Sequence, residues 1–178
     1  SLLVDAAALD RFVQSIGNWL DAGLDVPAEI FAAVKALSAE AAYRGVDSLV
    51  QMLGGRGYIE TNLAPQMLRD VRLLRIFEGP TETMQMFVGS RVAAGSQQLR
   101  SFLVDQLAAR ELSESLDGAA RRLARSSVDV QRRVALLAEL GCWTVWCAVL
   151  DAAGESHSVA FDPLAARARD WEIGRAHV

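Results

Sequence analysis

Hydrophobic residues recur at intervals of three and four along almost the whole chain, which is the spacing of a buried helix face. The clearest stretch is residues 28–53. Its apolar face consists of Ile30, Val34, Leu37, Ala41, Ala42 and Val46. No run of alternating β-branched residues predicts a strand. The pattern therefore predicts an all-α fold.

Glycine and proline residues mark where helices end and begin in the first hundred residues. The first helix ends near Gly23, and Pro27 is predicted at the first position of the second helix, which Gly54 stops. Gly79 and Pro80 interrupt the chain again, because no helix tolerates this pair in its interior. The predicted helices cover about residues 5–21, 28–53, 62–74 and 81–99.

The pattern changes after residue 100. Residues 102–112 predict a short helix and residues 141–153 an apolar one. Between them one apolar stripe predicts a longer helix that is interrupted at Ser127. The stripe consists of Leu116, Ala120, Leu123, Val130, Val134 and Leu137. Residues 154–163 predict a loop, in which His157 is interpreted as a surface residue.

Five arginines point away from that stripe, and they are Arg121, Arg122, Arg125, Arg132 and Arg133. A solvated helix face is the simplest interpretation, while anionic lipid or an acidic neighbouring domain are the alternatives. No apolar run approaches the roughly 20 residues of a membrane span. Any membrane contact is therefore expected to be peripheral, through this C-terminal region.

The chain has 178 residues, of which 52% are hydrophobic and 22% are charged. This composition is typical of a folded globular protein, and the length fits one domain or two small ones. A net charge of -4 and a pI near 5.2 oppose a nucleic-acid partner held by phosphate contacts. Lys35 is the one lysine among 18 basic residues, which suggests a GC-rich bacterial genome. We expect a cytoplasmic bacterial protein. The alternative is a cytoplasmic protein that contacts the membrane peripherally.

The two cysteines, Cys142 and Cys147, lie five residues apart in an apolar stretch. They are interpreted as core thiols in a reducing compartment, and no metal site is expected because further ligands are not nearby. The chain opens inside an amphipathic pattern without an initiator Met, and residues 172–178 resemble a translated sequencing adapter. We expect a fragment truncated at its front, with a non-native tail over residues 172–178.

Two segments carry candidate chemistry. The first, "QMLGGRGY" at residues 51–58, is a glycine-rich turn whose bare backbone N–H groups could approach a phosphate or a flavin. Taken alone, an ordinary glycine C-cap explains most of it, since no strand precedes it and the G-x-G-x-x-G order is absent.

The second segment is "RIFEGPTETM" at residues 75–84. Glu78 and Glu82 could be acids favoured by the helix dipole near a helix start. Glu78, however, follows Ile76 and Phe77 and precedes a chain break, so we expect it to lose hydration and to act as a general base. Its backbone N–H, outside a helix, is expected to be free to donate to a substrate oxygen.

Together, "QMLGGRGY" and "LRDVRLLRIFEGPTE" at this separation resemble the carboxyl-terminal helical domain of the acyl-CoA dehydrogenase family. The resemblance covers residues 1 to about 98 and implies an up-and-down helical bundle over residues 1–99. Residues 100–171 resemble the additional helical region of the very-long-chain members.

The resemblance implies that Glu78 is the base that removes the α-proton of a fatty acyl-CoA while the β-hydride passes to N5 of FAD. The Glu78 backbone N–H would help to hold the thioester carbonyl oxygen, with Phe77 and Gly79 beside it in the substrate site. The implied FAD contacts are Gln51, Met52, Leu53, Gly54 and Gly55, from a neighbouring subunit, and Pro80, Thr81 and Glu82.

The implied partners are fatty acyl-CoA, an electron-transfer flavoprotein and further copies of the chain in a homodimer or homotetramer. Many family members have Thr where this chain has Pro80, so a hydroxyl contact there is lost or passes to Thr81. The family's amino-terminal helical and central β domains are absent, and the fragment alone is therefore expected to be inactive. The alternatives are an acyl-CoA oxidase-like flavoenzyme and a noncatalytic helical oligomerisation module.

Overall fold

The computed structural model describes residues 2–152, with side chains from residue 6 onward, and all its regular elements are helices. They are α1 (Leu2–Asp21), α2 (Ala28–Leu53), α3 (Gly55–Tyr58), α4 (Leu63–Leu74), α5 (Thr81–Ala93), α6 (Gln97–Ser101), the π-helical turn η1 (Phe102–Gln106), α7 (Arg110–Ala124) and α8 (Val130–Ala152). No strand occurs in these residues, and the all-α prediction is confirmed. The predicted tail at 172–178, the loop at 154–163 and His157 lie outside the described residues.

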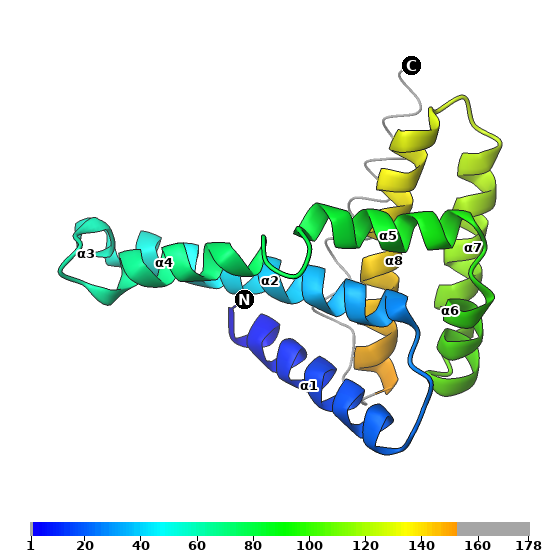
Figure 1. Cartoon of the computed structure of the whole chain (residues 1–178), viewed down its shortest axis with the longest axis horizontal. Helices are drawn as coiled ribbons and strands as arrows, with labels where there is room; N and C mark the ends of the chain where they lie inside the picture. Colours follow the sequence, from blue (N-terminus) through cyan, green and yellow to red (C-terminus); the bar gives the residue numbers. More distant parts are fainter. Residues whose placement is uncertain (1, 153–178) are drawn as a thin grey trace.

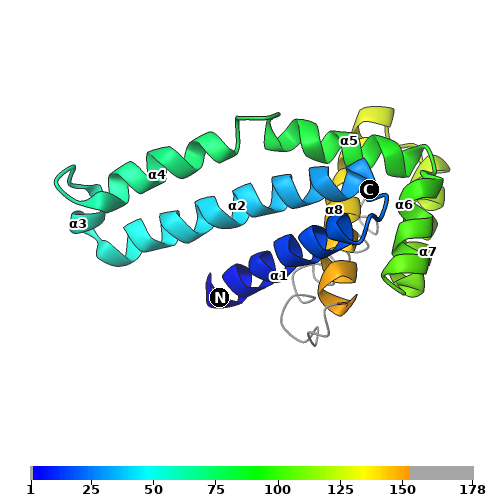
Figure 2. The same cartoon turned by 60° about the horizontal axis from the view of Figure 1, so that its bottom comes forward.

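The first helices run up and down beside one another (Figures 1 and 2). α1 leads into α2, and α4 followed by α5 returns along α2 in the opposite direction. On the side where α1 begins, α2 and α4 extend past α1 as an arm that carries α3 at its tip. α8 crosses the other end of this layer and packs against α5, α2, α1 and α7.

Prolines set the starts of both α2 and α5. Pro27 (φ −58°, ψ 142°) and Pro80 (φ −54°, ψ 146°) are extended N-cap residues, and neither helix has a side-chain cap. The prediction that Pro27 is the first helical residue was wrong by one position. An extended residue with a fixed φ interrupts the preceding backbone direction, so each proline lets the chain change course before the next helix.

The predicted helix over residues 81–99 is two helices. α5 ends at Ala93, and Gly95 (φ 71°) reverses the chain before α6 begins at Gln97. The N–H of Ser96 donates to the carbonyl of Arg91 at 3.0 Å, which closes the end of α5. Helices often end at a glycine in the left-handed region. Gly95 ends α5 in this way, although the apolar pattern predicts one continuous helix through this segment.

The predicted helices beyond residue 100 were divided correctly only in part. Residues 102–112 hold the turn η1 and the start of α7. The predicted interruption at Ser127 is confirmed, since α7 ends at Ala124 and α8 begins at Val130, and the apolar stripe therefore lies on two helices. Val130 is 64% exposed and is not part of the core. α8 then continues without interruption through residues 141–152. The two helices pack against each other, and Leu116, Leu123 and Leu137 of the stripe are buried.

The arginine face is only partly as predicted. Arg121, Arg122, Arg125 and Arg132 are exposed near the turn between α7 and α8. Arg133 is half-buried, and its Nη1 donates to the carbonyl of Ala124 at 3.2 Å. Arg133 therefore closes the turn between the two helices instead of facing solvent with the other four.

One core joins the two ends of the chain. Phe12 of α1 and Trp146 of α8 meet edge to face, with ring centroids 5.2 Å apart, and Val88 of α5 is buried in the same cluster. Among the described residues, α8 is the one helix long and apolar enough to cross a membrane, and 56% of its apolar window is buried in the protein. The expectation that no run reaches this length was wrong. The burial is what the core helix of a globular domain shows.

Cys142 and Cys147 are both buried in α8 without a disulfide bond. Burial raises the pKa of the Cys142 thiol to about 12 and that of the Cys147 thiol to about 11. Both thiols are therefore protonated near neutral pH, which suits core packing. No cluster of three metal-ligating side chains occurs within residues 2–152.

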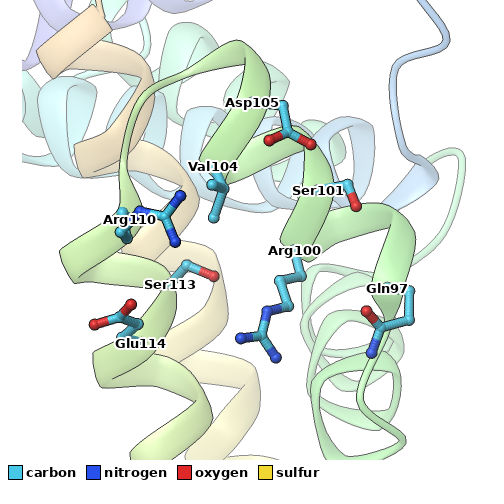
Figure 3. Close-up of a pocket in the computed structure, with 8 residues that line it drawn as sticks. All are labelled: Gln97, Arg100, Ser101, Val104, Asp105, Arg110, Ser113 and Glu114. Carbon is cyan, nitrogen blue, oxygen red and sulfur yellow. The ribbon is translucent and has the colours of Figure 1, made fainter.

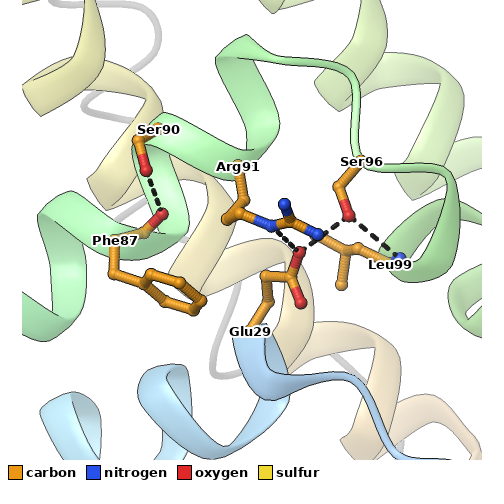
Figure 4. A network of polar contacts seen from close by, with 6 residues as sticks. All are labelled: Glu29, Phe87, Ser90, Arg91, Ser96 and Leu99. Carbon is orange, nitrogen blue, oxygen red and sulfur yellow. Dashed lines mark hydrogen bonds and ion pairs between the residues drawn. The ribbon is translucent and has the colours of Figure 1, made fainter.

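A buried carboxylate connects the start of α2 to the end of α5 (Figure 4). Glu29 is 1% exposed, and its Oε1 accepts hydrogen bonds from Arg91 Nε at 2.9 Å and from Ser96 Oγ at 2.7 Å. Burial alone would raise the pKa of Glu29, but these hydrogen bonds outweigh it and hold the pKa below the ordinary 4.5. The contact holds the bend between α5 and α6 against α2.

We expect Glu29→Gln to reduce the free energy of unfolding by about 1 to 3 kcal/mol at pH 7, because charge-assisted hydrogen bonds become neutral. The folded pKa is depressed, so the wild-type advantage is present above about pH 4.5 and is lost as the pH falls through the folded pKa. Urea unfolding between pH 3 and 7, at roughly one-unit steps, measures both effects. Glu111→Gln, at an exposed position of α7, is the control. Equal stability of the two variants at pH 7 would contradict the assignment.

Candidate active site

The segment between α4 and α5 is a short closed turn. The N–H groups of Ile76 and Phe77 both donate to the carbonyl of Leu73, at 2.9 Å each, and finish α4. The N–H of Thr81, the first residue of α5, donates back to the carbonyl of Arg75 at 3.1 Å. Residues 76–80 are therefore held as a loop whose two ends are joined.

Glu78 lies in this loop with a φ of 54°, in the left-handed region that non-glycine residues seldom adopt. Gly79 follows with a φ of 102°, and a Cβ at Gly79 would lie 2.4 Å from the terminal methyl carbon of Met84. Within the described residues no group accepts the backbone N–H of Glu78, and no cation pairs with its carboxylate. Backbone strain of this kind is concentrated at functional sites, although it does not identify the function.

The predicted apolar enclosure of Glu78 is not present in this chain. Glu78 is exposed, and Ile76 and Phe77 are 46% and 60% exposed. Since α4 and α5 both pack against α2, the loop joining them turns its side chains outward. Any water exclusion around the Glu78 carboxylate must be supplied by a surface that covers the loop.

Helix α2 holds the loop at both ends. Arg75 Nε donates to Glu40 Oε1 at 2.6 Å, and the Arg75 guanidinium lies 5.0 Å from the ring centroid of Tyr43. Lys35 Nζ donates to the carbonyl of Gly79. Sequence reasoning missed all these contacts. The one available signal was that Lys35 is the single lysine of an arginine-rich chain, and we had interpreted it only as a sign of genome composition.

The other candidate segment lies at the tip of the arm (Figure 1). α2 ends at Leu53, Gly54 (φ 54°) redirects the chain, and α3 follows. Gly57 is buried, and a Cβ there would lie 2.3 Å from the carbonyl oxygen of Val50. The close approach explains the glycine. The five predicted cofactor residues of this segment are all exposed, and they are Gln51, Met52, Leu53, Gly54 and Gly55.

The structure does not bring the two segments together. The 12 residues of α4, about 18 Å of helix, lie between them. Around the start of α5, Pro80 and Glu82 are exposed, whereas Thr81 is 2% exposed and its Oγ1 is buried without a hydrogen-bond partner. The Thr81 hydroxyl, predicted to take over a flavin contact, is therefore covered by this chain's own atoms.

Two hollows of the described structure lie away from both candidate segments. One of about 160 Å³, between α6, η1 and α7, is lined by both signs of charge, which come from Arg100, Arg110, Asp105 and Glu114 (Figure 3). Another of about 240 Å³ lies between Leu24 and Gln106. Neither is lined by residues 51–58 or 75–82.

The exposed residues at the arm tip fit one edge of a flavin site. The Gln51 amide both donates and accepts, and the backbone around Gly54 and Gly55 has no side chain to keep a ligand away. Such groups suit a dinucleotide such as FAD. They form a surface and not an enclosed pocket, so other walls are needed to complete the site.

Comparison with known proteins places the chain in a family. The family model for the acyl-CoA dehydrogenase C-terminal domain matches residues 1–93. The rat very long-chain specific acyl-CoA dehydrogenase is 32% identical over 90 residues, 48% of this chain and 14% of the relative. The human protein of that name is 32% identical over 84 residues, 45% and 13% of the two chains.

A 3-(aryl)acrylate reductase from Clostridium sporogenes is 38% identical over 58 residues, 33% of this chain and 15% of the relative. No solved structure matches. The matches to these curated relatives span about a seventh of the relatives' length. With the family model covering more than half of its residues, the chain belongs to the acyl-CoA dehydrogenase family.

Proposed function

We propose that the chain is the C-terminal part of an FAD-dependent acyl-CoA dehydrogenase and that Glu78 is its catalytic base. The observation that carries the proposal is the loop between α4 and α5. It holds an exposed carboxylate and an unpartnered backbone N–H on one residue, in a left-handed conformation. Those are the two groups needed to remove a proton next to a carbonyl.

The chemistry requires both groups. The α-proton of a thioester is a far weaker acid than a carboxylic acid, so a carboxylate removes it only while the developing enolate oxygen is stabilised. The Glu78 N–H would donate to that oxygen as the Glu78 carboxylate takes the α-proton. Bound FAD would supply the acceptor for the β-hydride. Exposed Phe77 offers an apolar surface that helps to exclude water once substrate is bound.

We propose that the enzyme is a homodimer or homotetramer, with the arm tip of one subunit contributing to the FAD site of another. The separation of the two segments by α4 supports this, because one chain cannot place both at one compact site. Large apolar side chains exposed along the arm offer an interface. They are Met52, Leu53, Tyr58, Ile59, Leu63, Leu73 and Leu74.

The substrate, direction and electron acceptor are also proposals. The very long-chain relatives favour fatty acyl-CoA oxidation, with an electron-transfer flavoprotein as acceptor, whereas the Clostridium relative is named for a reduction. The exposed arginines at the α7–α8 turn favour peripheral contact with an anionic membrane.

Anaerobic addition of a long-chain acyl-CoA to the full-length protein that contains this chain should bleach its flavin absorption, whereas free CoA should not. Reoxidation by electron-transfer flavoprotein or by oxygen separates a dehydrogenase from an oxidase-like enzyme. The 178-residue chain alone should bind no FAD, because the proposed site needs the arm tip of another subunit and a surface that covers the exposed Glu78 loop. A full-length protein that binds flavin but is not reduced by any acyl-CoA would refute the proposed function and favour a noncatalytic oligomerisation module.

A further inference from the structure

We infer that Lys35 is a positioning residue that holds the Glu78 loop in its reactive conformation. The inference rests on the proposed function, because it concerns how the base is held. Lys35 lies in the first half of α2, 44 residues before Gly79, and its half-buried side chain reaches across to the α4–α5 loop. There the ammonium donates to the carbonyl of Gly79, the residue that follows the base.

The position of this contact matters because Glu78 and Gly79 both have positive φ, at 54° and 102°. A non-glycine residue leaves the left-handed region unless its surroundings hold it there. The hydrogen bond from Thr81 to Arg75 joins the ends of the loop but does not fix the peptides between them. Lys35 holds the carbonyl between Gly79 and Pro80, and thereby limits rotation on the C-terminal side of Glu78.

Attachment of α2 to the loop does not by itself require Lys35. The pair of Arg75 and Glu40, with both side chains 24% exposed, already joins α4 to α2, and Tyr43 adds a cation–π contact. The Lys35 ammonium makes no ion pair with Glu78, so it does not occupy the carboxylate that is proposed to remove the proton. Lys35 therefore contacts the backbone beside the base and leaves the base itself unpaired.

The chemical nature of the side chain also fits. Lysine presents a compact ammonium on a flexible stem and can donate to a single carbonyl oxygen, whereas arginine presents a planar fork suited to two acceptors. The other 17 basic residues of the chain are arginines, yet this position carries lysine. Arginine here would keep the charge and a donor with a poorer fit.

The test uses the full-length flavoprotein and four variants: Lys35→Met, Lys35→Arg, Glu78→Gln and Arg44→Met. Arg44→Met is the matched control, because it removes an exposed cation from the same helix. Stopped-flow measurement of flavin reduction at saturating acyl-CoA, expressed per bound flavin, gives the rate. We expect Lys35→Met to be slowed about tenfold to 100-fold, Lys35→Arg to recover part of that loss and Arg44→Met to match wild type.

Melting temperature and flavin content separate positioning from simple stabilisation. Slow reduction by Lys35→Met with unchanged flavin content supports the inference. A wild-type rate per bound flavin overturns it, including when the variant is less stable or holds less flavin. If Lys35→Met does not fold, Lys35→Ala, which also removes the donor, is measured in its place by the same criteria. A Glu78→Gln enzyme with wild-type rate refutes the base and the role of Lys35 together, whereas an inactive Glu78→Gln beside a fully active Lys35→Met refutes Lys35 alone.

Discussion

Glu78→Gln in the full-length protein is expected to lower the rate of flavin reduction by acyl-CoA about 100-fold to 10,000-fold while leaving the flavin bound. Glutamine keeps the size of the side chain and the backbone N–H, so the loop and the substrate oxygen contact are retained. The amide cannot accept the α-proton. Since Glu78 is exposed and unpaired in the described structure, the change should leave the melting temperature nearly unaltered.

Glu82→Gln distinguishes between the two acids of the segment. Glu82 is exposed in the first turn of α5, four residues after Glu78. Its removal is expected to change flavin content at most, and to leave the reduction rate per bound flavin close to wild type. Loss of the rate in Glu82→Gln with retention in Glu78→Gln would transfer the base to Glu82. Stopped-flow absorbance of the flavin measures both variants in one experiment.

Gly89→Ala is expected to destabilise the fold by about 3 kcal/mol, and Gly89→Val to prevent folding. A Cβ at Gly89 would lie 2.3 Å from the carbonyl oxygen of Val134 and 2.7 Å from the backbone nitrogen of Ala138. Both atoms belong to the backbone of α8, so no side-chain rotation can relieve the contact. α5 and α8 would have to separate, and they carry the most extensive helix pairing in the described structure.

Gly17→Ala is the matched control for that prediction. Gly17 lies within α1, and nothing approaches within 4 Å of a Cβ placed there. Because alanine favours helix more than glycine, this variant should gain about 0.5 to 1 kcal/mol. Urea unfolding followed by circular dichroism at helical wavelengths compares the two. Equal stability of Gly89→Ala and Gly17→Ala would show that α5 and α8 do not cross where the structure places them.

Prediction from sequence was most accurate where a strong local signal ends a helix. The bounds of α2 agree with the predicted 28–53, because Pro27 and Gly54 interrupt the backbone whatever surrounds them. Prediction was less exact between α7 and α8, where it placed an interruption at Ser127 within a turn over residues 125–129 that contains neither glycine nor proline. There the apolar period continues across the turn. The break is set by polar contacts, such as the Arg132 N–H that donates to Asp129 Oδ1 at 3.0 Å, and by the packing of the two helices on each other.

The candidate site divides in the same way. The sequence identified Glu78 from the Gly-Pro break and from the resemblance of two linked motifs, and these are local properties of the chain. The prediction that apolar residues enclose the Glu78 carboxylate was wrong, because residues adjacent in sequence need not cover one another's side chains. Ile76 and Phe77 face outward because α2 takes the inner sides of α4 and α5.

The sequence by itself determined the helical class, the positions of the main breaks and the family, because helical period, proline, glycine and short motifs act within a few residues. Only the tertiary structure showed that Lys35 holds the loop, that Glu29 joins α2 to the α5–α6 bend and that α4 keeps the two motifs apart. Each of these depends on contacts or separations between distant segments. Chain topology sets such distances, and no local pattern encodes them.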